Sequence, residues 1–274
     1  MLGKLMKYEI KATARLFLPI FAALLLIAVA NRFILGSGSE TPTIISMAIY
    51  IFIMIGMFVM ALFVTIQRFY KNLLSEEGYL MFTLPVRPWQ HIISKMLIAM
   101  FWVISSTFVA IFSIFIISFR YNSWQNFLQE IGNLQALIAK IGFPFYTISL
   151  EIVFSMILGL MSIILILYAS MAIGHLFNNH RVLASFGAFI LLNILTQILT
   201  LFIGEQYSSY IFNVSIMNDT VNQEIYFGNT PLTMAGFASE LQTLMLVSIG
   251  ITILFNLGYF FITNYILSKR LNLE

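Results

Sequence analysis

Apolar side chains fill six long runs of the chain, and polar residues gather in the segments between them. A helix needs roughly 20 apolar residues to cross a hydrocarbon core of about 30 Å, and each run is about that long. A span in lipid must satisfy its own backbone hydrogen bonds, which favours helices, and the strand alternation of an outer-membrane barrel is absent. The six predicted spans are Leu16–Leu35, Ile44–Ile66, Met96–Phe119, Ile148–Ile173, Val182–Ile203 and Leu241–Leu267.

Composition places the chain among integral membrane proteins. Hydrophobic residues make up 60% of the 274 positions and charged residues only 9%, whereas soluble domains have about 45–50% and about 25%. The expected fold is therefore an all-α integral membrane protein with one transmembrane domain over residues 1–274. The chain has no Cys, so a disulfide framework, a thiolate nucleophile and a Cys metal site need not be considered.

Basic residues are divided unequally between the two sides that these spans define. If the N-terminus is inside, all 14 Lys and Arg residues except Arg32, Arg120 and Lys140 lie in cytoplasmic segments. The positive-inside rule then predicts a multi-pass protein of the plasma membrane with both termini in the cytoplasm. The net charge of +3 comes from these flanking residues, so nucleic acid is not an expected partner.

The N-terminus also imitates a secretory signal peptide. Basic residues precede the apolar stretch Leu16–Ile27, and "AVA" at 28–30 resembles a cleavage site. Cleavage would leave five spans and move one terminus across the membrane. We favour an uncleaved first span, in which Arg32 reaches the interface and Pro19 occupies the opening turn.

Three polar segments are predicted to lie at the membrane surfaces. Residues 1–15 place apolar side chains on one side and Lys4, Lys7, Lys11 and Arg15 on the other, which is typical of an interfacial amphipathic helix. Residues 120–147 hold apolar side chains at helical spacing and are expected to form an extracellular helix. Residues 204–240 contain no Lys or Arg and are expected to form an extracellular cap or re-entrant hairpin before the sixth span.

The spans contain amides and hydroxyls but no ionisable residue away from their ends. Ion-coupled carriers place such groups at mid-membrane, so a self-powered transporter is disfavoured. Asn193, Gln197 and Asn256 are the candidate polar residues of a translocation path. The alternative role for all three is hydrogen bonding between helices, which we favour.

An intramembrane protease is a further alternative. Glu76 and Glu77, together with the H-x-x-x-N spacing of His175 and Asn179, are similar to parts of the prenyl-processing protease family. That family's Arg would fall at Met81, and its F-x-x-x-H motif is absent. We therefore expect neither a metal site nor a catalytic site.

The segment 67–95 between the second and third spans carries the clearest functional signal. "QRFYKNLLSEEG" can continue as an amphipathic helix at the cytoplasmic surface, and Gly78 is well placed to end it. Pro85 and Pro88 then interrupt the backbone before a new helix begins near Trp89. A short rigid projection into the cytoplasm suits a mechanical contact.

Here the chain resembles the membrane subunit of type-two ABC transporters, particularly the small Gram-positive permeases of lantibiotic and antibiotic export and self-protection. The resemblance rests on "EEGYLMFTLPVRPWQHIISKML", on the amphipathic "KLMKYEIKATAR" start, on six spans with an outer insertion before the last, and on the "KRLNLE" end. It covers essentially the whole chain. The first of these runs is fairly specific, whereas the general layout is not.

The resemblance implies a coupling helix at about 68–77 that docks on a separate ATPase. Glu76 and Glu77 would meet basic groups of that ATPase, although both carboxylates could instead only solvate a loop. Gly78 would permit the turn, and "TLP" would return the chain to the membrane. The residues assigned in this way are Arg68, Tyr70, Leu73, Leu74, Glu76, Glu77 and Gly78 for coupling, and Thr83, Leu84 and Pro85 for re-entry.

The chain lacks G-x-x-x-x-G-K-[ST], so it is not expected to be an enzyme or to bind ATP and Mg²⁺ itself. The resemblance implies two copies of an ABC ATPase, which would hold both ligands, and a second permease, identical or homologous. The expected function is ATP-driven export of an amphipathic peptide or lipophilic antibiotic. The alternatives are a membrane-embedded binding, immunity or scaffold protein without transport and, less favoured, an ion-coupled carrier or channel.

Overall fold

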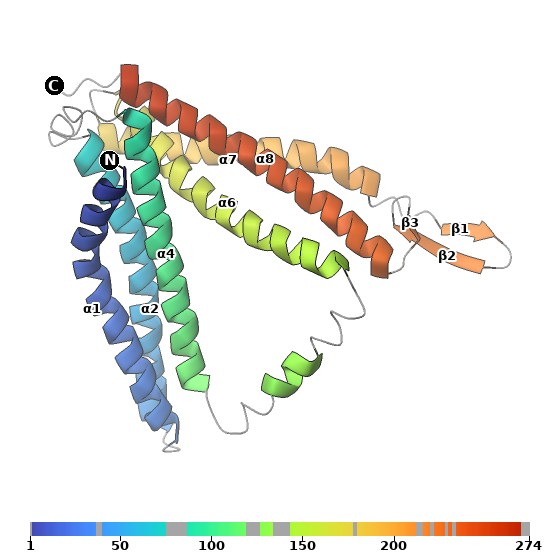
Figure 1. Ribbon diagram of the computed structural model, residues 1–274, viewed down its shortest axis with the longest axis horizontal. Coiled ribbons are helices and arrows are strands. Elements are labelled where there is room, and N and C mark those ends of the chain that lie inside the picture. The colour runs from blue at the N-terminus through green and yellow to red at the C-terminus, as the bar shows by residue number, and fades with distance from the viewer. Residues whose placement is uncertain are drawn as a thin grey trace. The chain divides into compact units, whose positions relative to one another are not determined.

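Long helices dominate the structure, a computed structural model that describes residues 2–36, 40–74, 87–118, 127–133, 143–177, 180–211, 216–219, 222–227, 230–231 and 234–269. Six of its helices are long and apolar enough to cross a membrane, in agreement with the six predicted spans. They are α1 (Leu2–Gly36), α2 (Glu40–Phe69), α4 (Pro88–Ser118), α6 (Phe143–Gly174), α7 (Arg181–Ile211) and α8 (Met234–Lys269) (Figure 1). The chain is therefore a multi-pass membrane protein.

Helix α4 begins where the sequence predicts it. Pro88 occupies the first helical position, where a missing N–H has no cost. The backbone N–H of Arg87 donates to the side-chain oxygen of Gln90 at 3.4 Å, and the N–H of Gln90 donates to the carbonyl of Arg87 at 2.9 Å. The Gln90 side chain thus supplies the half of a capping box that reaches back to the N-cap N–H, and the other bond is a backbone turn between residues three apart.

The expected separate helix over residues 1–15 is not seen. Helix α1 runs without interruption from Leu2 to Gly36, so Pro19 lies inside it and not in an opening turn. The apolar side that predicts an interfacial helix does exist, but Met6, Ile10 and Ala14 pack against the core formed with α2 and α4. Amphipathic spacing cannot tell a bilayer surface from two neighbouring helices. The position of this segment at the membrane surface remains a prediction.

Two compact units make up the chain, one of residues 1–128 with 264–274 and the other of residues 129–263. In the first unit, α1, α2 and α4 lie side by side (Figure 1). Its core holds eleven buried hydrophobic residues, in which the Phe17 and Trp102 rings stack with centroids 4.4 Å apart. Because lipid is as apolar as these side chains, close packing and hydrogen bonds hold such helices together.

In the second unit, α6 packs most extensively on α7. Gly174 ends α6, and a Cβ atom there would overlap the backbone and side-chain oxygen of Ser185 on α7. His180, which precedes α7, has a positive φ of 61°. The helices thus approach closely at small residues, as the spacing of Ser170 and Gly174 indicates.

The segments outside the six helices depart from the all-α expectation. Strands β1 (Ile216–Asp219), β2 (Asn222–Phe227) and β3 (Thr230–Pro231) form an antiparallel sheet in the order β1-β2-β3. Ile216 pairs with Ile225, and Tyr226 pairs with Pro231. Strands β1 and β2 form a β-hairpin within residues 204–240, but the extracellular cap or re-entrant hairpin expected there remains a prediction. Of the helix expected in 120–147, residues 127–133 are helical.

Candidate functional site

The α2–α4 connection is only partly described. Helix α2 continues into a π-helical turn, η1 (Tyr70–Leu74), in which Leu73 and Leu74 are 0% and 1% exposed. Arg68 and Tyr70 are half-buried. The two buried leucines therefore offer no surface to a partner in this conformation. The coupling and re-entry residues that lie outside the described part of the chain are Glu76, Glu77, Gly78, Thr83, Leu84 and Pro85.

A buried ion pair stands on the other side of this connection. Lys95, about two turns into α4, donates from Nζ to Oε1 of Glu9 on α1 at 2.5 Å. The Lys95 side chain is 1% exposed and that of Glu9 is 10% exposed. Each of these buried charges is stabilised by the other, because either one alone would carry an uncompensated desolvation cost.

A second polar contact lies next to the ion pair. Nε1 of Trp102 donates to the hydroxyl of Thr13 at 2.7 Å, and this hydroxyl donates to the carbonyl of Glu9 at 2.8 Å. On α4, His91 is fully buried, and the Ser94 hydroxyl donates to its carbonyl at 3.0 Å. Helices α1 and α4 are thus joined by two side-chain contacts, Lys95–Glu9 and Trp102–Thr13, at the end of segment 67–95.

Glu9 is not among the residues predicted from the sequence, and Lys95 is predicted only as one of the charges that set topology. The two residues are 86 positions apart, so no local pattern relates them. One signal was available, because Glu9 is the only acidic residue among the first 39 positions. An isolated acid in a basic segment indicates a specific basic partner.

Polar contacts also join the opposite end of the first unit. The Asn31 amide donates to the carbonyl of Ser46 at 3.3 Å, and the hydroxyls of Tyr50 and Ser113 lie 2.8 Å apart. Arg32, expected only to reach the interface, donates to the carbonyl of Ile116 near the end of α4 at 3.3 Å. A cation is favourable at this negative end of a helix.

The candidate polar residues of a translocation path do not converge on one point. Asn193 donates to the carbonyl of Phe189 in its own helix at 2.8 Å, and Gln197 is exposed on α7. Asn256, which is buried on α8, donates to the carbonyl of Leu158 on α6 at 3.1 Å. The expectation of a helix-to-helix hydrogen bond is therefore confirmed for Asn256.

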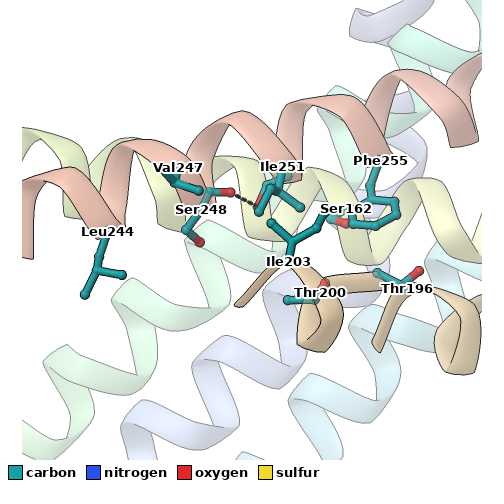
Figure 2. Close-up of a pocket in the computed structure, with 10 residues that line it drawn as sticks. Ser162, Thr196, Thr200, Ile203, Leu244, Val247, Ser248, Ile251 and Phe255 are labelled. Atoms are coloured by element: carbon teal, nitrogen blue, oxygen red, sulfur yellow. Dashed lines mark hydrogen bonds between the residues drawn. The ribbon is translucent and has the colours of Figure 1, made fainter. Parts of the chain in front are cut away.

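A hydroxyl-lined cavity of about 240 Å³ lies within the second unit between α6, α7 and α8 (Figure 2). The cavity is partly open, and none of the side chains that line it is ionisable. Five of them carry hydroxyls, and the others are apolar. The lining consists of Ser162 on α6, Thr196, Thr200 and Ile203 on α7, and Leu244, Val247, Ser248, Ile251, Thr252 and Phe255 on α8.

Outside the cavity lining, Gln242 on α8 donates to Oε1 of Glu151 on α6 at 3.2 Å. The other carboxylate oxygen of Glu151 is buried without a hydrogen-bond partner among the described residues. The Gln242–Glu151 hydrogen bond therefore joins α8 to α6.

Within the described ranges, no group of three or more His, Asp or Glu side chains could hold a metal ion. His175 instead lies 3.4 Å from the guanidinium of Arg181. Comparisons with protein-family models, with curated proteins and with solved structures find no significant match to this chain. The function must therefore be argued from the residues themselves.

Proposed function

We propose that the chain is the membrane-spanning permease subunit of an ATP-driven ABC exporter. The observation that carries the proposal is the run "EEGYLMFTLPVRPWQHIISKML", which resembles the coupling region of type-two permeases and connects two of six candidate spans. The chain has no P-loop motif, so two copies of a separate ATPase subunit supply the energy. A second permease, identical or homologous, completes a twofold assembly.

The burial pattern on both sides of the coupling segment supports this proposal. At the start of segment 67–95, Phe69, Leu73 and Leu74 are buried, and at its end Ile92 and Lys95 are buried. A segment held at both ends by packed side chains moves with its helices. A displacement imposed by nucleotide-driven closure of the ATPases would therefore pass to α2 and α4, and through the Glu9–Lys95 pair to α1.

The cargo proposed is an amphipathic peptide or a lipophilic antibiotic, moved outward by alternating access. The support is chemical, since the cavity between α6, α7 and α8 combines hydroxyls with apolar walls and carries no charge. An ion gradient is a poor source of energy for such a chain. Its buried ion pair lies about two turns from the start of α1 and of α4, and not at the middle of either candidate span.

The test is co-purification of an ATPase with the full-length chain from native membranes. Leu73 and Leu74 are unsuitable for it, because Asp at either buried position would disrupt the fold itself. We use the Glu76→Lys/Glu77→Lys double variant, which reverses the charges proposed to meet the ATPase. Glu130→Lys is the matched control, since Glu130 is exposed in the helical segment 127–133.

Wild type and Glu130→Lys should each retain a P-loop protein with vanadate-sensitive ATPase activity, and the double variant should lose it at unchanged membrane content. If intact wild-type protein retains no nucleotide-binding partner, the exporter proposal fails. The non-transporting binding, immunity or scaffold function then takes its place. Gradient-driven flux through the purified chain alone would instead favour a carrier or channel.

A further inference from the structure

Each of the three helices around the cavity presents one hydroxyl that has no hydrogen-bond partner among the residues that the structure describes. They are Ser162 on α6, Thr200 on α7 and Ser248 on α8 (Figure 2). Serine and threonine in transmembrane helices commonly donate to the carbonyl one turn earlier. Thr196 and Thr252 do so, to Leu192 and Ser248 at 2.7 and 2.8 Å. The three remaining hydroxyls can therefore both donate and accept.

In a membrane-spanning helix such hydroxyls are costly when they face only hydrocarbon. A polar group transferred to an apolar medium without a hydrogen bond loses the energy of its hydration. Three helices that each direct one hydroxyl toward a single cavity are better explained by a common polar occupant than by chance. The occupant must offer both acceptors and donors at nearby positions.

The rest of the lining limits the charge of that occupant. Ile203, Leu244, Val247, Ile251 and Phe255 form apolar walls. A formal charge placed among them would have no counterion within the lining and would be strongly disfavoured at low dielectric. The occupant is therefore uncharged where it meets the cavity.

Volume limits its size. At about 240 Å³ the cavity is smaller than the roughly 300–1,000 Å³ of sites that enclose a whole small molecule. The cavity is also partly open. It thus suits one end of an amphiphile whose remaining chain lies outside, in the bilayer.

We infer that the cavity between α6, α7 and α8 binds an uncharged glyceride, a lipid whose glycerol hydroxyls and ester carbonyl meet Ser162, Thr200 and Ser248. The glycerol hydroxyls supply donors and acceptors, and the ester carbonyl supplies a further acceptor. The acyl chain continues along the apolar walls. This site does not depend on the proposed ATPase partner, so the two proposals fail separately.

The test uses the full-length chain in phosphatidylcholine nanodiscs that contain a monoacylglycerol with a diazirine in its acyl chain. After irradiation, mass spectrometry locates the adducts, and unlabelled monoacylglycerol competes for the site. We expect saturable labelling of the cavity walls, centred on Val247, Ile251 and Phe255. An unlabelled fatty acid or plain hydrocarbon of the same chain length should compete more weakly than the monoacylglycerol. Diazirine versions of these two molecules should label the same positions more weakly.

Two kinds of variant separate hydrogen bonding from shape. The Ser162→Ala/Thr200→Val/Ser248→Ala variant removes the hydroxyls and keeps the space. Since each net hydrogen bond contributes a factor of about two to twelve, the half-maximal competitor concentration should rise about tenfold or more. Ser248→Leu fills the cavity and should abolish labelling by the glyceride and the hydrocarbon alike.

The matched control carries the same chemical changes elsewhere. Thr107→Val/Ser149→Ala/Ser155→Ala removes three hydroxyls that donate to carbonyls of their own helices, and it should bind like wild type. Only variants whose thermal unfolding midpoint matches that of wild type are compared, so that misfolded protein is excluded. The inference is overturned if labelling is not saturable, if the triple cavity variant matches this control, or if the fatty acid competes as well as the glyceride.

Discussion

The ion pair between Glu9 and Lys95 is the most consequential contact between single residues in the first unit. Lys95→Met leaves the Glu9 carboxylate buried without its cation and should lower the free energy of unfolding by about 3–5 kcal/mol. The double variant Glu9→Leu/Lys95→Met removes both charges and should recover most of this loss. Thermal unfolding in detergent measures both effects. Lys11→Met changes an exposed Lys on α1, the helix that carries Glu9, and should alter the unfolding midpoint little. A loss equal to that of Lys95→Met would contradict the stabilising role of the ion pair.

The Trp102–Thr13 hydrogen bond gives a second prediction for single residues. Thr13→Val keeps the size of the side chain but leaves the buried indole N–H of Trp102 without an acceptor. The expected loss is about 1–3 kcal/mol, the cost of an unsatisfied buried donor. Thr13→Ser retains the acceptor and should be the milder change. The same unfolding assay checks the order, and a Ser variant less stable than the Val variant would refute it.

Neither contact could be predicted from the sequence, and the reason lies in distance along the chain. The capping residues Arg87, Pro88 and Gln90 act on their own neighbours, so the start of α4 near Trp89 could be predicted. The partner of Lys95 is 86 positions away and is selected by the packing of α1 on α4. The residues Ser162, Thr200 and Ser248 are also far apart in sequence, and only the assembled helices place their hydroxyls around one cavity.

Among the helices, α6 and α7 offer the sharpest comparison between two glycines. Gly174→Ala places a methyl group against the Ser185 backbone and should cost about 1–3 kcal/mol, as overpacking does. Gly159→Ala makes the same change in the same helix, where nothing lies within 4 Å of the new Cβ. Because Ala favours helices over Gly by up to about 1 kcal/mol, this variant should be neutral or more stable. Equal effects in thermal unfolding would show that close approach at Gly174 does not matter.

Helices were easier to predict than strands because a span leaves a run of about 20 apolar residues, whereas a surface sheet leaves a few alternating positions. Strand β2 does not show even this signal, because its six residues are three polar ones followed by three apolar ones. The continuity of α1 through residues 1–15 was missed for another reason. Lys7, Lys11 and Arg15 are exposed in the structure, as they would also be on an interfacial helix.

At the scale of the whole molecule, the grouping of helices could not be read from apolar patterns. In water a buried face differs in composition from an exposed one, but in lipid both faces are apolar. Leu165 is buried in α6 while Leu191 on α7 is 63% exposed, although the two residues are chemically identical. The division into residues 1–128 with 264–274 and residues 129–263 therefore emerges only from the structure.

The orientation of the molecule in the membrane is still a prediction, and the absence of Cys makes it directly measurable. Single cysteines replace Lys7, Lys71 and Glu130, which are exposed near the start of α1, after α2 and after α4. A membrane-impermeant maleimide should label Glu130→Cys in intact cells, but Lys7→Cys and Lys71→Cys only after permeabilisation, because the positive-inside rule places the basic flanks in the cytoplasm. Ala169→Cys, fully buried, should stay unlabelled in both conditions. If positions 71 and 130 are labelled from the same side, α4 does not cross the membrane. If position 7 is missing from the mature protein, the signal peptide is cleaved and the uncleaved first span is wrong.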